Sequence, residues 1–128
     1  MERKRVSSGS PYEPTIGFSR AVRVGDRIIV SGTGPIAPDG SSAAVGDAYG
    51  QAKRCLEIIK QAIEEAGGKM TDVVRTRQFV TDVSVWEAVG KAHGEFFADV
   101  RPASTMVVVA GLVRPEWLVE IEAEAIVG

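Results

Sequence analysis

Reactive and metal-binding side chains are scarce in this sequence, which contains one cysteine and one histidine. A single cysteine excludes an intramolecular disulfide framework and indicates a reducing compartment. Cys55 falls on the apolar positions of an expected helix, where we favour a buried and inert thiol. His93 lies in a second expected helix beside Phe96 and Phe97, where packing or capping accounts for it. We therefore predict no metal site, and neither a Cys–His nor a Ser–His–Asp arrangement.

An excess of positive charge and long apolar runs are also missing. The 128 residues include 15 Lys and Arg and 17 Asp and Glu, for a formal net charge of −2. This balance provides no electrostatic footprint for a nucleic-acid partner. No apolar run approaches the length of a membrane span, and the first residues lack the apolar core of a signal peptide. The sequence therefore predicts a cytoplasmic protein without a membrane or nucleic-acid partner.

The length predicts one domain with a substantial core. Residues 1–15 contain Gly9, Pro11 and Pro14, so we expect an irregular N-terminal arm there and a single domain over residues 16–128.

Hydrophobic periodicity predicts five strands and two helices within that domain. In chain order, we expect strands at 18–24 and 27–31, a helix at 47–66, a strand at 73–80, a helix ending near 97, and strands at 104–110 and 118–127. Asp47 is a candidate cap for the first helix, and Asp82 or Ser84 for the second, whose apolar stripe begins at Trp86. The order β-β-α-β-α-β-β predicts an α+β fold with both helices on one face of a mixed sheet.

The strand expected at 104–110 is largely apolar on both faces, since Val107 and Val109 alternate with Met106 and Val108. Burial on both faces is implied, whereas helices can cover only one face of a two-layer monomer. We therefore expect self-association.

The most distinctive pattern is the acidic alternation at 118–126, which places Glu120, Glu122 and Glu124 on one strand face. One interpretation is an ordinary solvated sheet face. The other makes one of the three carboxylates the acid or base of a site, which requires a cleft and a nearby counter-charge. The alternation by itself favours the first.

Two further segments have both a structural and a functional interpretation. The glycine-rich turn at 31–35 matches no nucleotide-binding pattern, although its backbone N–H groups could bind an anion. Arg75 and Arg77 share one strand face, either as surface cations that cover apolar neighbours or as guanidinium groups for a substrate carboxylate.

Several sequence blocks occur together and in order. They are IGFSRAV at 16–22, IVSGTGP at 29–35, AGG at 66–68, FVTD at 79–82, FF at 96–97, RPAST at 101–105 and VEIEA at 119–123. Over residues 16–127 the chain resembles the RidA/YjgF family of reactive-intermediate deaminases, also labelled endoribonuclease L-PSP or translation inhibitor. The resemblance implies a chorismate-mutase-like subunit, a homotrimer whose sheets pack inward as a barrel, and clefts between subunits. The implied activity is hydrolysis of enamine or imine intermediates, released by pyridoxal-phosphate enzymes, to a 2-oxo acid and ammonia, without a cofactor of its own.

The resemblance also implies roles for individual residues. Glu120 matches the acidic residue that activates or positions water, and Ser31 and Gly32 match positions that line the cleft. Phe18 stands where the deaminases have tyrosine, and Ser104 where they have the arginine that binds the substrate carboxylate.

On this basis we expect Glu120 to be catalytic. The residues expected to bind substrate are Phe18, Ser31, Gly32, Thr33, Arg77, Ser104 and Thr105. Exchange of the arginine–carboxylate pair for serine predicts a loss of roughly 1.5–3 kcal/mol, or about 10- to 150-fold, in binding of carboxylate-bearing imines. The alternative functions are a trimeric protein that binds a small ligand without chemistry, and the historical endoribonuclease or translation-inhibitor label.

Overall fold

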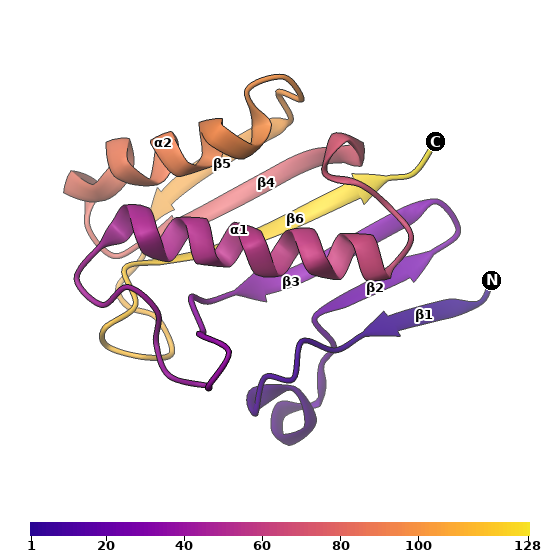
Figure 1. Ribbon diagram of the computed structural model, residues 1–128, viewed down its shortest axis with the longest axis horizontal. Coiled ribbons are helices and arrows are strands. Elements are labelled where there is room, and N and C mark those ends of the chain that lie inside the picture. The colour runs from indigo at the N-terminus through magenta and orange to yellow at the C-terminus, as the bar shows by residue number, and fades with distance from the viewer.

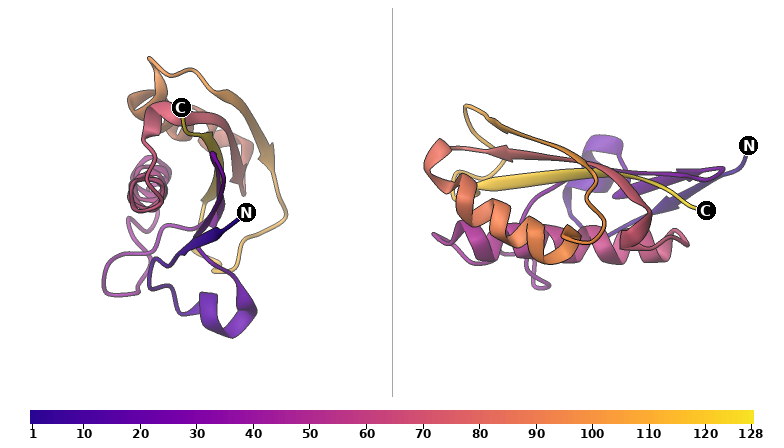
Figure 2. Two further views of the ribbon diagram at one scale, coloured as in Figure 1. Left: turned by 90° about the vertical axis from the view of Figure 1, so that its right-hand side faces the viewer. Right: turned by 90° about the horizontal axis from the view of Figure 1, so that it is seen from above.

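A six-stranded sheet covered on one side by two helices forms the protein, and the computed structural model describes residues 1–128 (Figure 1). The strands are β1 (Arg3–Val6), β2 (Ala21–Val24), β3 (Arg27–Thr33), β4 (Val73–Val80), β5 (Ala103–Val108) and β6 (Val119–Ile126), and the helices are α1 (Ala48–Glu65) and α2 (Trp86–Phe97). Their order across the sheet is β1-β2-β3-β6-β4-β5, with β4 and β5 parallel and all other pairs antiparallel. The predicted α+β fold is confirmed, because both helices lie on the same side of this mixed sheet (Figure 2).

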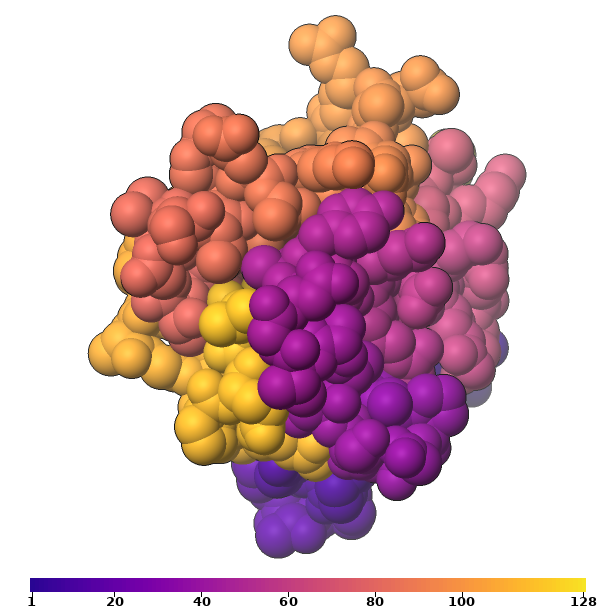
Figure 3. Space-filling model, turned by 60° about the vertical axis from the view of Figure 1, so that its left-hand side comes forward, coloured from indigo at the N-terminus to yellow at the C-terminus, as the bar shows by residue number.

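Helix α1 follows the predicted cap, since the Asp47 carboxylate accepts a hydrogen bond from the Gly50 backbone N–H at 3.1 Å. Its apolar stripe, including Leu56, Ile59 and Ile63, is fully buried against the sheet. Helix α2 lies beside α1 on the same face of the molecule (Figure 3). Neither helix combines the length and the apolar character that a membrane crossing requires.

Strand β6 lies at the centre of the sheet, and its alternation decides which side chains enter the core. Val119, Ile121, Ala123 and Ala125 are buried beneath the helices, whereas the intervening glutamates project from the opposite face. The face predicted to be acidic is therefore the one that no helix covers.

The first residues differ from the sequence expectation of an irregular arm. Residues 3–6 form strand β1, which pairs with β2, and residues 13–17 form a helical turn. Three of the four strand residues are charged and exposed, which an edge strand tolerates because only Val6 must enter the core. The arm thus extends the sheet by one strand.

Trp86 also differs from expectation. Although it falls on the predicted apolar stripe of α2, it is the first residue of the helix, and 55% of its surface is exposed. The side chains that α2 buries are Val89, Ala92 and Phe97. Asp82 caps the short helical turn that precedes the helix.

The uncovered face of the sheet is partly apolar. Ile29 of β3 and Val107 of β5 are 48% and 43% exposed, and Phe79 of β4 is half-buried. Edge strand β5 is exposed over most of its length. This face provides the apolar area that the sequence pattern associated with self-association.

The loop that leads into β6 is attached to α1 by one buried side chain. Gln51 is fully buried; its Nε2 donates to the Glu116 carbonyl at 3.0 Å, and its Oε1 accepts from the Leu118 N–H at 2.8 Å. These two bonds position the first residues of β6, including Glu120.

We predict that Gln51→Met lowers the free energy of unfolding by about 1–3 kcal/mol, because the two backbone groups of the loop lose their partner. The matched control is Gln61→Met on the same helix, since Gln61 is exposed and bonds only to Glu65. Urea denaturation of both variants measures the difference; equal stabilities would contradict this role of Gln51.

Candidate functional site

The site begins with an irregularity in β3. Between Val30 and Thr33 the pairing with β6 contains a β-bulge, so that Ser31 and Gly32 lie opposite the single residue Glu122. The bulge brings the Gly32 backbone against the Glu120 side chain. A Cβ atom on residue 32 would overlap Glu120 Oε2, so a larger residue there would displace the Glu120 carboxylate from this position.

Glu120 differs electrostatically from the other two glutamates on its strand. Glu122 Oε1 lies 2.6 Å from Arg77 Nη1, and Glu124 Oε2 lies 3.3 Å from Arg27 Nη2. Glu120 has neither an ion pair within 4.0 Å nor a hydrogen-bond donor from the protein. Burial raises the pKa of Glu120, the charge of Glu122 also raises it, and Arg20 partly opposes them. Glu120 is therefore the one carboxylate of the three without an ion-pair partner.

Arg20 supports the site by binding the backbone of the bulge, a role that was not predicted from the sequence. Its side chain is buried; Nη1 donates to the Gly32 carbonyl at 2.6 Å and to Thr33 Oγ1 at 3.1 Å. Glu13 Oε2 lies 3.7 Å from its Nε. Burial lowers the pKa of Arg20, and the charges of Glu13 and Glu120 oppose that shift. The bulge is thus held by a buried cation.

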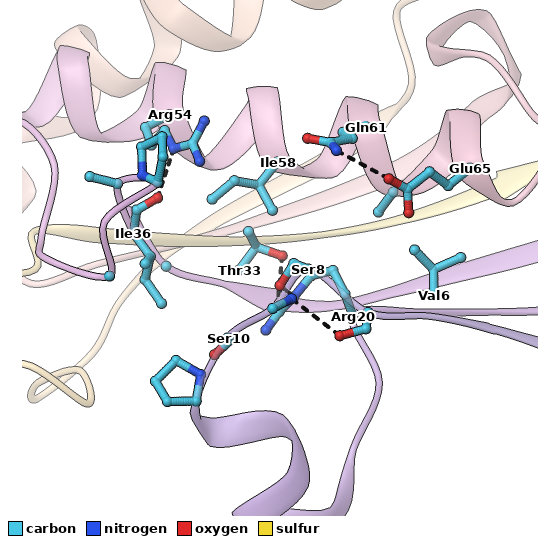
Figure 4. A pocket seen from close by; sticks show the side chains of 18 residues that line it. Val6, Ser8, Ser10, Arg20, Thr33, Ile36, Arg54, Ile58, Gln61 and Glu65 are labelled. Atoms are coloured by element: carbon cyan, nitrogen blue, oxygen red, sulfur yellow. Dashed lines mark hydrogen bonds between the residues drawn. The ribbon is translucent and has the colours of Figure 1, made fainter.

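Arg20 also lines a groove of about 150 Å³ between the N-terminal segment and α1 (Figure 4). In this close-up Ser8, Thr33 and Ile58 surround the groove, and Ser8 Oγ accepts a hydrogen bond from Arg20 Nε at 3.3 Å. A second hollow, of about 260 Å³, lies on the uncovered sheet face beside Arg77 and Glu122.

Apart from Gly32, the residues near β3 that were predicted to line the cleft contact the Arg20 segment rather than Glu120. Ser31 Oγ donates to the Ser19 carbonyl at 2.7 Å, and its N–H donates to the Arg20 carbonyl, so that N–H is not free for an anion. Thr33 is buried and directed toward Arg20. Phe18 is half-buried, with the guanidinium carbon of Arg20 5.4 Å from its ring centroid.

Ser104 lies on the other side of the sheet. It is paired with Thr76 across β4 and β5, and its Oγ lies 2.8 Å from Thr76 Oγ1 on the face that the helices cover. Thr105, the next residue, faces the uncovered side with Arg77. Strand β5 is two strands from β6, about 10 Å across the sheet. One chain therefore does not bring Glu120 together with Ser104 or Thr105.

The remaining candidates have structural partners. Arg77 forms an ion pair with Glu122 and also lies 3.9 Å from Glu124 Oε1, so its guanidinium is already engaged. Cys55 is fully buried, and burial raises the pKa of its thiol, as expected for an inert cysteine. No three His, Cys, Asp or Glu side chains converge in an arrangement that could hold a metal ion.

A polar cluster beneath α2 was not predicted from the sequence. Thr76 and Gln78 are buried, and they join Ser104 to His93 through hydrogen bonds of 2.7 to 3.1 Å. The sequence of β4 contained an indication of this cluster, because polar residues occupy both faces of the strand, including the face directed at the core.

Fold and site together define a small α+β protein with an open sheet face and a single unpaired, desolvated carboxylate beside a glycine bulge. The family model described as endoribonuclease L-PSP matches residues 9–127. Among curated proteins, an uncharacterised protein of Streptomyces coelicolor is 43% identical over 95% of this chain and 90% of its own length. A RutC family protein of Pyrococcus abyssi is 34% identical over 98% of both chains.

Solved structures agree with the family match. A Mycobacterium tuberculosis member of the YjgF/YER057c/UK114 family superposes with a TM-score of 0.88 and 44% identity, covering 98% of this chain and all of the other. The Escherichia coli YjgF protein superposes with a TM-score of 0.83 and 33% identity, over 96% and 98% of the two chains. The chain belongs to the RidA/YjgF family, whose model carries the endoribonuclease L-PSP description.

The raised pKa of Glu120 predicts that its charge destabilises the fold. A carboxyl group whose folded pKa exceeds the ordinary value of 4.5 contributes stability below that value, and this contribution is lost as the pH rises through the folded pKa. We therefore predict that Glu120→Gln raises Tm by a few degrees at pH 7, and that the difference shrinks below about pH 4.5.

The matched control is Glu122→Gln, which removes an ion pair with Arg77 and should not raise Tm at pH 7. Calorimetric scans of both variants between pH 4 and 8 measure the difference. A Glu120→Gln variant no more stable than the parent at neutral pH would show that the carboxylate is well solvated.

Proposed function

We propose that this protein is a RidA-like hydrolase that acts on imine or enamine metabolites at clefts between the subunits of a homotrimer. One observation carries the proposal: Glu120 is the only glutamate of β6 without a protein partner, and burial raises its pKa. A carboxylate of this kind suits general base catalysis, because it is free to accept the proton of an attacking water molecule.

The reaction is the addition of water followed by loss of ammonia. The substrate is the protonated imine. As the Glu120 carboxylate removes a proton from water, the oxygen forms a bond to the imine carbon, and the π electrons of C=N move to nitrogen, which gives a neutral tetrahedral intermediate. The protonated Glu120 then returns its proton to the amine, the C–N bond breaks, and ammonia leaves as the intermediate loses its hydroxyl proton to solvent and the carbonyl forms.

Assembly with further copies of the chain is part of the proposal. The exposed Ile29 and Val107 on the uncovered face support packing against a second copy. The placement of Ser104 on the opposite face from Glu120 supports a site that takes one residue from each of two subunits.

The expected carboxylate-binding positions offer little to a substrate carboxylate. Ser104 stands where the family has arginine, and Arg77 is paired with Glu122. Neither offers the bidentate contact that a carboxylate prefers. Arg75, on the same open face, has no ion pair, but its side chain is exposed to solvent, where a contact with a carboxylate contributes little. Imines derived from simple amines are therefore better candidates than 2-imino acids.

Replacement of Glu120 tests the proposal directly. We predict that the parent protein accelerates hydrolysis of imines released in situ by an amine oxidase, and that Glu120→Ala reduces kcat by at least about 100-fold, the low end of general base contributions. The mass in solution should remain three times the chain mass. Glu122→Ala is the matched control and should retain activity; full activity in Glu120→Ala would overturn the assignment.

Restoring the arginine tests the specificity argument. We predict that Ser104→Arg increases affinity for 2-oxo acids, and lowers KM for 2-imino acids, by about tenfold or more, because a guanidinium–carboxylate contact replaces a neutral one. Thr105→Arg places the same group on the other face of β5 and should produce no gain. Calorimetric titration with pyruvate compares them; equal affinities would show that the ligand does not reach residue 104.

A non-catalytic binding role is the competing function, favoured by the same lack of a free cation at Ser104 and Arg77. Thermal stabilisation by a small metabolite that is never consumed would support it over catalysis. RNA cleavage, which the family description names, has less support: the net charge is −2, and the chain has one histidine rather than a pair for acid and base catalysis.

A further inference from the structure

A continuous chain of hydrogen bonds leads from the only histidine to Ser104. His93 Nε2 of α2 lies 2.7 Å from Thr76 Oγ1 of β4, which lies 2.8 Å from Ser104 Oγ of β5. Both distances are those of well-formed hydrogen bonds. Thr76 is fully buried, whereas Ser104 is exposed at the sheet edge, so the chain runs from beneath α2 to the surface.

Gln78 holds the two hydroxyl oxygens in place. Its Nε2 donates to Thr76 Oγ1 at 2.8 Å and to Ser104 Oγ at 3.1 Å, and its Oε1 lies 3.2 Å from Ser104 Oγ, where it accepts the serine proton when that proton is not directed at Thr76. Each hydroxyl has one proton, so along the path from Ser104 through Thr76 to His93 the donors can run in two directions. In one, Ser104 donates to Thr76 and Thr76 donates to His93 Nε2, which leaves a lone pair of Ser104 free for a ligand. In the other, His93 Nε2–H donates to Thr76 Oγ1, and the Thr76 hydroxyl donates to Ser104 Oγ.

The imidazole connects this chain to solvent. His93 Nδ1 has no protein partner and is not buried. No acidic or basic side chain forms a hydrogen bond or ion pair with the ring, whose neighbours are Thr76 and Phe97, the latter with its ring centroid 4.7 Å away. Burial lowers the pKa of His93, so the neutral ring, which accepts a proton, predominates near pH 7.

We propose that His93, Thr76 and Ser104 form a proton relay in which Ser104 removes the hydroxyl proton of the tetrahedral intermediate and His93 passes a proton to solvent. The inference rests on the proposed function, because it assigns a second proton carrier to the same reaction. In that reaction Glu120 takes the proton of the attacking water and returns it to the amine. The intermediate must then lose its hydroxyl proton as the C–N bond breaks.

With the relay included, every proton of the reaction has a donor and an acceptor. A protonated imine and water give the neutral intermediate and a protonated Glu120. As ammonia leaves with the Glu120 proton, the hydroxyl proton of the intermediate passes to Ser104. The Ser104 hydroxyl proton passes to Thr76, and the Thr76 hydroxyl proton passes to His93 Nε2. His93 Nδ1 then releases its proton to solvent, after which tautomer exchange of the imidazole and rotation of the two hydroxyl groups restore the starting direction of the hydrogen bonds. The net products are the carbonyl compound, ammonia and one proton.

The relay predicts a graded set of variants. Thr76→Val and His93→Gln each break it and should lower kcat for amine-derived imines by about 10- to 100-fold, with KM little changed, because water replaces general base catalysis only in part. Thr76→Ser keeps the hydroxyl and should remain within about threefold of the parent. The double variant should be no slower than either single one, since both remove the same path. The limb of the pH profile that reflects His93 should disappear in His93→Gln.

The outcomes separate this inference from the proposed function. If Glu120→Ala is inactive and Thr76→Val and His93→Gln are as fast as the parent, the relay is wrong and the hydrolase remains. A parent protein inactive on every imine contradicts the function and the relay's catalytic role together.

The hydrogen-bonded chain itself can be tested without turnover. Since His93 is the only histidine, its imidazole nitrogens give unambiguous signals in ¹⁵N NMR. Its titration should shift in Thr76→Val and, through Thr76, in Ser104→Ala, while Thr76→Ser resembles the parent. Identical titrations in all four proteins would overturn the coupling.

Discussion

The buried guanidinium of Arg20 is the interaction on which the rest of the site depends. It joins three segments that are distant in sequence: Glu13 of the N-terminal turn, the backbone of the β3 bulge, and, through its charge, Glu120 of β6. A buried cation is stable only when hydrogen bonds and an opposite charge compensate its lost hydration. The N-terminal segment therefore contributes to the site indirectly, by supplying the compensating carboxylate.

The two strands beside β6 explain why one of its glutamates differs from the others. On the β4 side Glu122 lies opposite Arg77, whereas Glu120 lies opposite Phe79, which offers no cation. On the β3 side the bulge turns the Gly32 backbone toward Glu120, and the nearby Arg20 guanidinium already donates to carbonyl and hydroxyl oxygens. Arg20 thus opposes part of the rise that burial causes in the pKa of Glu120, without forming an ion pair with it, so the carboxylate stays available to a ligand.

The sequence predicted the elements well, because apolar periodicity directly reports burial: the spacing of Leu56, Ile59 and Ile63 and the alternation of β6 are both confirmed. It missed β1, since a short edge strand of charged residues has no such signature. The resemblance singled out Glu120, but the local pattern could not, because its distinction arises from the residues that β3 and β4 place beside it. The role of Arg20 and the Thr76–His93 contact also depend on which segments meet in space.

The two residues assigned to the proposed reaction lie on opposite faces of the sheet. Glu120 belongs to the open face and Ser104 to the helix-covered face at the free edge of β5, so no rotation of side chains within one chain brings them to a common substrate. A mechanism that uses both therefore needs the edge of one chain to approach the open face of another. Such a site forms only on association, which couples activity to subunit concentration by mass action. Under the proposed mechanism, Glu120 and Ser104 of one chain would stay apart and would meet a common substrate only in the assembly of two chains.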